Sequence, residues 1–188
     1  YYSKNLLDAD RPDEAIRLAD MGLKVNPSNG WLYLTKGAAY LMLGDSVNAQ
    51  ICKNVNLKYP EQYPVTKARV TTNIGAMHFW AKDTVGAMAY YRQAFEMDKR
   101  EKVSLYMLIM CQLRTNMNLD ECAELIEYGL KVFPDIKTFH WAKGLYLHKL
   151  GRHQEALTIL NELKENWIGY AKTLRKDIQE VERALAKI

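Results

Sequence analysis

Four histidines and three cysteines are the side chains of this chain that could do acid–base chemistry or bind a metal ion. They are His78, His140, His148, His153, Cys52, Cys111 and Cys122. Zinc sites and catalytic pairs bring such residues together at short, fixed spacings, and the sequence contains no His-x-x-x-His or Cys-x-x-Cys pair. We therefore expect each histidine to be a partly exposed helix residue and each cysteine a small core residue. No metal, cofactor or catalytic activity is expected.

The acidic residues and the glycines also fit structural roles. Asp13, Glu14, Asp120, Glu121 and Glu155 fall in the first turns of predicted helices, where the helix dipole favours a carboxylate. The glycines are spread over predicted helices and turns and form no phosphate-binding loop. These patterns favour a protein that is not an enzyme.

Composition narrows the possible partners. The 188 residues are 48% hydrophobic and 26% charged, which is typical of one folded domain with a continuous core. The longest mostly apolar stretch, Leu105 to Leu113, is about half of the ~20 residues that a membrane-spanning helix needs. The 26 basic and 22 acidic side chains alternate along the chain, so the net charge of +4 does not form a nucleic-acid footprint. We expect a protein partner.

The compartment is left open by the sequence. Unpaired cysteines are typical of a reducing compartment, which favours the cytoplasm. The start Tyr1-Tyr2-Ser3, without methionine, indicates a fragment or a processed form. A periplasmic or membrane-associated location, as part of a longer chain, is therefore the alternative.

A repeat organises the elements that must position these side chains. Small residues recur at Ala15, Ala49, Ala87, Cys122 and Ala156, at intervals of 34, 38, 35 and 34. A period near 34 is typical of a helical solenoid. A similar pattern precedes two of them: Gly37, Gly44 and Asp45 precede Ala49, and Gly144, Gly151 and Arg152 precede Ala156. The sequence resembles the tetratricopeptide repeat (TPR) over nearly its whole length.

This resemblance implies an all-α fold, a right-handed solenoid of antiparallel helix pairs. The solenoid is expected over residues 1–165, with units at about 1–28, 29–64, 65–100, 101–135 and 136–165. Asp45 and Asp83 are predicted to cap second helices. A loop that is longer than usual, with Pro60 and Pro64, explains the interval of 38.

Some positions depart from the pattern of the family. Lys53 and Asn56 stand where a bulky and a small apolar residue are usual, and Lys82 replaces the usual glycine. In the fourth unit, which diverges most, Met117 stands in the glycine place.

The last segment, 166–188, has a different period. Apolar residues alternate at spacings of four and three, which predicts a long amphipathic helix. It either caps the last repeat or pairs with a second copy as a coiled coil. The homodimer would form through Trp167, Leu174, Ile178, Val181 and Leu185.

The resemblance also implies that the first helices line a concave surface where a partner binds. The residues expected there are Leu34, Leu41, Phe79, Met107, Arg114, Trp141 and His148. We predict a non-catalytic adaptor or assembly scaffold that binds a peptide or helical segment of another protein in this apolar groove, with Arg114 orienting a carboxylate or carbonyl of the ligand. Two alternatives stay open: the inward residues pack on one another, or the chain is a structural or oligomerisation repeat domain of a larger envelope or membrane-associated protein.

Two ligands known for related repeats are not expected. The carboxylate clamp of co-chaperones needs lysine, asparagine and arginine at fixed places, which include Lys4, Thr35, Arg69 and Asn73 here, and only Arg69 agrees. Repeats that read RNA bases use polar side chains, and the inward positions here are mostly apolar.

Overall fold

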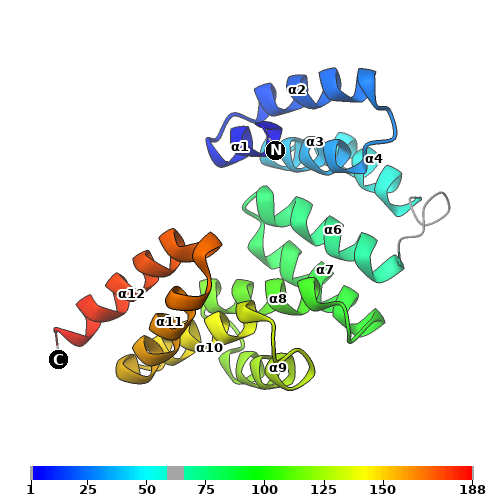
Figure 1. The fold of residues 1–188 in the computed structure, drawn as a ribbon. Coiled ribbons are helices and arrows are strands. Elements are labelled where there is room, and N and C mark those ends of the chain that lie inside the picture. Colours follow the sequence, from blue (N-terminus) through cyan, green and yellow to red (C-terminus); the bar gives the residue numbers. More distant parts are fainter. Residues whose placement is uncertain (1, 59–65, 188) are drawn as a thin grey trace. The chain divides into compact units, whose positions relative to one another are not determined.

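The computed structural model describes residues 2–58 and 66–187, and this part of the chain consists of helices and turns with no strand (Figure 1). The expected long loop, Tyr59 to Pro64, lies outside the described residues. The helices are α1 (Tyr2–Asp8), α2 (Pro12–Val25), α3 (Gly30–Met42), α4 (Ser46–Leu57), α6 (Lys67–Trp80), α7 (Thr84–Met97), α8 (Lys102–Thr115), α9 (Leu119–Val132), α10 (Lys137–Lys149), α11 (His153–Asn166), the 3-10 helix η1 (Ile168–Tyr170) and α12 (Ala171–Leu185).

Short turns join these helices in successive pairs, and each turn contains a residue in the left-handed backbone region. The φ angles are 60° at Asp10, 75° at Gly44, 64° at Lys82, 54° at Asn116 and 77° at Gly151. Glycine adopts this conformation without a steric penalty, and asparagine and aspartate tolerate it better than most residues. In the turn of the fourth pair the left-handed residues are Asn116 and Asn118, with φ of 53° at Asn118, and they lie on either side of Met117, which stands in the glycine place.

The predicted caps of α4 and α7 are confirmed. The Asp45 carboxylate accepts a hydrogen bond from the Asn48 amide at 3.0 Å, and the Asp83 carboxylate accepts one from the Gly86 amide at 2.8 Å. Hydrogen bonds from the side chain and backbone of Asn48 lower the pKa of Asp45. Each cap satisfies a helix N–H group that has no partner within the helix.

The small residues that define the repeat are packing positions. Ala15, Ala87, Cys122 and Ala156 have an exposed fraction of 0%, and Ala49 has 2%. Glycine likewise allows two helices to approach closely. A Cβ atom at Gly75 on α6 would lie only 2.7 Å from the ring of Tyr91 on α7. The repeat in the sequence is therefore a repeat of helix contacts.

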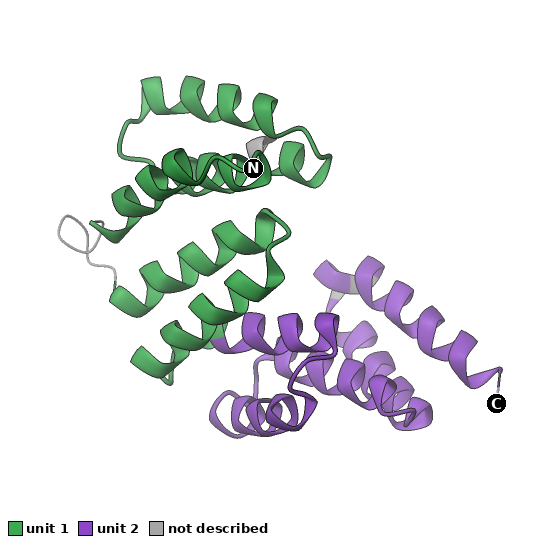
Figure 2. Cartoon of the chain, turned by 180° about the vertical axis from the view of Figure 1, so that it is seen from behind, with its two compact units in different colours: residues 1–104 green, residues 105–188 purple. Residues whose placement is uncertain are grey.

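The chain forms two compact units, Tyr1–Ser104 (unit 1) and Leu105–Ile188 (unit 2), each with its own core (Figure 2). In unit 1 the buried cluster comes from α1, α2, α3 and α6. It comprises Leu6, Leu7, Ala15, Leu34, Ala38, Ala39, Val70, Ile74, Met77 and Trp80. In unit 2 a buried cluster comes from α10, α11 and α12, and it comprises Trp141, Leu147, Ala156, Leu160, Leu163, Leu174, Ile178 and Val181.

Within the described ranges, none of the helices has the length and apolar character that crossing a membrane requires.

Candidate functional site

The expected binding residues of unit 1 divide between the core and its edge. Leu34 on α3 is 1% exposed and belongs to the buried cluster. Leu41, near the end of α3, and Phe79, near the end of α6, are partly buried and pack against that cluster. Leu34 is thus a core residue, whereas Leu41 and Phe79 keep part of their apolar surface accessible.

The expected residues of unit 2 divide in the same way. Met107 on α8 is partly buried, and Arg114, near the end of that helix, is exposed. Trp141 on α10 is only 8% exposed, so it differs from the exposed anchor that the sequence predicted. His148, two turns further along α10, is partly buried.

Trp141 is buried because the end of the chain covers it. Its indole N–H donates a hydrogen bond to the Asp177 carboxylate on α12, with 2.8 Å between Nε1 and Oδ2. The rings of Trp167 and Tyr170 lie 6.1 and 6.2 Å from its ring centroid. Burial raises the pKa of Asp177 despite the hydrogen bond from Trp141. The C-terminal segment of the chain therefore covers this part of the predicted site.

The C-terminal stripe contributes to this core. Leu174 and Val181 are 0% exposed, Ile178 is 4% exposed, and all three belong to the cluster of unit 2. Leu185 remains 38% exposed, and Trp167 packs against the cluster. A coiled-coil seam needs these side chains on an open face, so a homodimer through this stripe would require α12 to leave its own core.

The histidines of the chain have structural partners. His148 and His153 face each other with 3.0 Å between their Nδ1 atoms, so one Nδ1 atom carries a hydrogen and donates a hydrogen bond that the other accepts. Burial and the neighbouring His153 lower the pKa of His148. His78 contacts the Asp83 carboxylate at 2.8 Å, and the Nε2 atom of His140 lies 2.7 Å from the carbonyl oxygen of Pro134.

The three cysteines are buried, and this burial makes their thiols unreactive. Burial raises the pKa of Cys52 to about 11 and those of Cys111 and Cys122 to about 12. The thiolate, which is the nucleophilic and metal-binding form, is therefore scarce at neutral pH. Among residues 2–58 and 66–187, no three side chains of His, Cys, Asp or Glu are grouped as a metal site would require.

Two grooves that sequence reasoning missed lie against the second helices. In unit 1 a groove of about 460 Å³ is lined by α4, α6 and α7. In unit 2 a groove of about 440 Å³ is lined by α9, α10, α11 and Arg152 in the turn between α10 and α11. The only signal for the first groove in the sequence is Lys53, which stands where the repeat usually has a bulky apolar residue.

Comparisons with known proteins agree with this architecture. Residues 113–171 match the tetratricopeptide repeat family. A tetratricopeptide repeat protein from Parabacteroides merdae has a similar structure, with a TM-score of 0.64 and 14% identity over 99% of this chain and 72% of that chain. A thermophilic TPR protein from Thermus thermophilus has a TM-score of 0.62 and 16% identity over 96% of this chain and 95% of the other.

YrrB, described as a TPR protein with an unusual peptide-binding site, has a TM-score of 0.56 and 15% identity, covering 94% of this chain and 88% of its own. At these identities the likeness is one of fold. No curated protein matches the chain.

The resemblance expected from the sequence is confirmed: the chain is an all-α helical-repeat protein with the TPR fold. This fold generally mediates protein–protein interaction, and proteins built from it are typically non-catalytic scaffolds.

Proposed function

We propose that this protein is a non-catalytic adaptor or assembly scaffold that binds a peptide or helical segment of a partner protein on the faces of its first helices. The contact residues are Leu41 and Phe79 in unit 1, and Met107, Arg114 and His148 in unit 2. Leu34 and Trp141 support these faces from the core.

The observation that carries the proposal is the position of Leu41 and Phe79. Both side chains pack on the buried cluster of unit 1, which holds them in place, yet both stay partly exposed. Apolar side chains fixed on a rigid base are typical anchors of protein interfaces, because little conformational entropy is lost when a partner covers them.

In unit 2 the chemistry of the face is mixed. Met107 provides an adaptable apolar contact, and the guanidinium of Arg114 suits a carboxylate or carbonyl oxygen. The alternative of a repeat domain that oligomerises through its last helix receives no support from these contacts, because α12 uses its apolar stripe within unit 2.

The test is an affinity capture from the native source, quantified by mass spectrometry, with the full chain and two variants. Phe79→Glu places a charge on the proposed face, and Met21→Glu is the matched control, because Met21 is 63% exposed on α2. Circular dichroism first establishes that both variants fold.

A partner retained by the native chain and by Met21→Glu, but lost with Phe79→Glu, supports the proposal. Truncation of an interface anchor costs about 2 kcal/mol or more, which lowers retention at least roughly tenfold. Equal retention by all three proteins would remove the faces of the first helices from the binding site.

A further inference from the structure

The groove of unit 1 combines an apolar floor with basic side chains. Leu57 of α4 and Met97 of α7 supply apolar surface and are 47% and 51% exposed, and the buried Val70 and Ile74 of α6 lie at the base of the groove. Its volume of about 460 Å³ falls within the roughly 300–1,000 Å³ of ligand-binding clefts. The groove can therefore receive one large apolar side chain and the backbone beside it.

The charged residues that line this groove are lysines. Lys53 donates a hydrogen bond to the Tyr90 hydroxyl at 2.6 Å, and its Nζ atom lies 4.9 Å from the centroid of that ring. These contacts hold the ammonium group at the groove. Lys67 is exposed at the first position of α6, and no Asp or Glu is among the described residues that line the groove.

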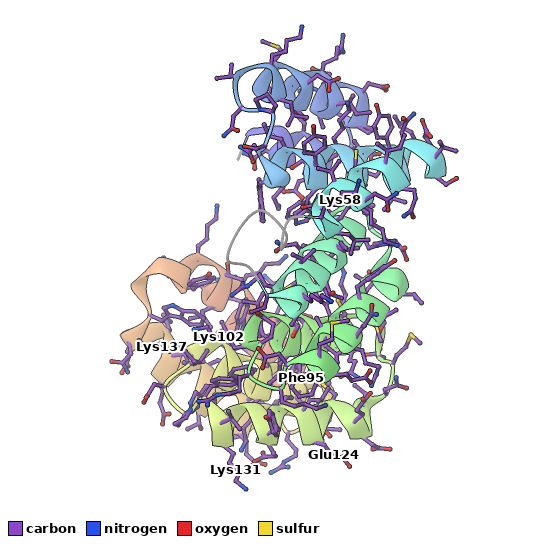
Figure 3. The ribbon with its side chains drawn as sticks, turned by 90° about the vertical axis from the view of Figure 1, so that its right-hand side faces the viewer. Lys58, Phe95, Lys102, Glu124, Lys131 and Lys137 are labelled. Atoms are coloured by element: carbon purple, nitrogen blue, oxygen red, sulfur yellow. The ribbon has the colours of Figure 1, made fainter. Side chains whose placement is uncertain are left out.

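Two further features make this region electropositive. Helix α4 contains no acidic residue, and Lys58 follows at its end, where Figure 3 labels it. The dipole of α6 adds positive potential at its first turn, so Lys67 stands where a cation is unfavourable to the helix. An anionic partner would relieve this unfavourable charge.

The corresponding groove of unit 2 also contains basic residues, but there they pair with carboxylates that line the same groove. Lys143 pairs with Glu127 at 3.2 Å, and Arg152 pairs with Glu155 at 2.6 Å, all four of them lining the groove. The charges of that groove are therefore balanced within the chain. The groove of unit 1 has a similar volume and a similar set of helices, but no carboxylate that could balance its lysines is among its described lining residues.

We propose that the groove lined by α4, α6 and α7 is a second interaction surface, which binds an acidic segment of a partner protein. Carboxylates of that segment pair with Lys53 and Lys67, and an apolar side chain next to them enters between Leu57, Ile74 and Met97. Charge complementarity of this kind selects the partner and speeds association. The departure of Lys53 from the repeat pattern then has a function.

Selection from a phage-displayed library of random peptides on the immobilised full chain tests this inference. We expect the selected pool to be enriched in peptides that combine Asp or Glu with large apolar residues. Its affinity should fall at least about tenfold for Lys67→Glu, because a like-charge pair replaces an opposite-charge pair. The helix dipole favours glutamate at this position, so the substitution preserves α6.

Lys102→Glu is the matched control, since Lys102 is also exposed and also opens a helix, α8 (Figure 3). We expect this variant to keep the native affinity for the pool. Lys53→Met tests the second lysine while keeping an apolar stem over Tyr90, and it should weaken binding as well. Phe79→Glu should leave this binding unchanged, which separates the groove from the faces of the first helices.

Several results would overturn the inference. A pool without enrichment in acidic residues, or with equal affinity for Lys67→Glu, rules out the acidic segment. Phosphatidylglycerol vesicles that bind the native chain but not Lys67→Glu, in the absence of peptide binding, would assign the groove to a membrane surface. A molar mass in light scattering that is halved by Lys67→Glu would assign it to a second copy of the chain.

Discussion

At the scale of single residues, Trp141 donates a hydrogen bond to Asp177 and is almost fully buried. It is therefore not an accessible part of the predicted binding surface. The indole N–H is almost fully buried, and the Asp177 carboxylate is its acceptor. Burial raises the pKa of this carboxylate, so its ionised form is less favourable in the folded than in the unfolded chain. The contact between Trp141 and Asp177 therefore stabilises the fold through the hydrogen bond and not through the charge of the carboxylate.

Two substitutions of Asp177 should separate the hydrogen bond from the charge. Asp177→Asn keeps an acceptor oxygen and removes the charge, so we expect a free energy of unfolding at pH 7 equal to or above that of the native chain. Asp177→Ala leaves the buried indole N–H unpaired, which costs about 1–3 kcal/mol. Urea denaturation followed by tryptophan fluorescence measures both, and equal loss in the two variants would contradict this account.

The histidine pair predicts a dependence of stability on pH. Burial and His153 lower the pKa of His148, while Glu180 and Asp177 act in the opposite direction without reversing the shift. A lowered pKa means that the unfolded chain binds the proton more tightly, so protonation favours unfolding. The contribution of His148 is fully present above its unfolded pKa of about 6.5 and is lost as the pH falls below it.

We therefore expect the melting temperature of the native chain to fall between about pH 7 and pH 5, across the ordinary pKa of histidine. The fall should be smaller in His148→Gln, which retains a polar side chain but cannot take up the proton. Calorimetry at a series of pH values provides the comparison. An identical pH profile for the two proteins would show that His148 does not contribute.

At the scale of elements, helix α12 belongs to the core of unit 2. Ile178 is buried in the cluster with Leu160 and Trp141, whereas Leu185 on the same helix is 38% exposed. The apolar stripe is thus filled by the chain's own helices.

Ile178→Ala should therefore lower stability without changing the oligomeric state. We expect a loss of about 2–5 kcal/mol, as for other large-to-small changes in a core, and a much smaller loss for the control Leu185→Ala. Light scattering should give one molar mass for all three proteins. A molar mass that is lower for Ile178→Ala than for the native chain would instead show that α12 forms an interface between two copies of the chain.

At the scale of the whole molecule, the fold is a series of helix pairs, and the chain divides into two units with separate cores. In repeat proteins each pair contacts its neighbours, so stability is roughly a sum of local contributions and nearest-neighbour contacts. A defect in one pair should therefore have its largest effect nearby along the chain.

Leu7→Ala offers a test of this locality, because Leu7 is 0% exposed in the core of unit 1. The substitution should cost about 2–5 kcal/mol locally. Hydrogen exchange measured by mass spectrometry should show the greatest loss of protection in α1, α2 and α3, and little change in α11 and α12. A uniform loss over the chain would indicate one cooperative unit.

Much of the architecture was predictable from the sequence, because it depends on local interactions that recur in each repeat. The spacing of Ala15 through Ala156 predicted the helix pairs, since only small residues permit the close approach of helices there. Asp45 and Asp83 predicted helix starts, because their carboxylates accept bonds from amides only three residues away. At Lys82, which replaces the usual glycine, the structure has a left-handed turn, whereas in the fourth pair the left-handed residues are Asn116 and Asn118, on either side of Met117.

The sequence by itself determined the class of fold, because helix period and caps are encoded within a few residues of one another. Only the tertiary structure decided which inward residues remain accessible. The burial of Trp141 depends on Asp177, 36 positions later, and on the packing of α12. The charge of the groove of unit 1 depends likewise on Lys53 and Lys67, which come from different helices and have no acidic neighbour among the lining residues that the structure describes. Such contacts join distant parts of the chain, so no local pattern reports them.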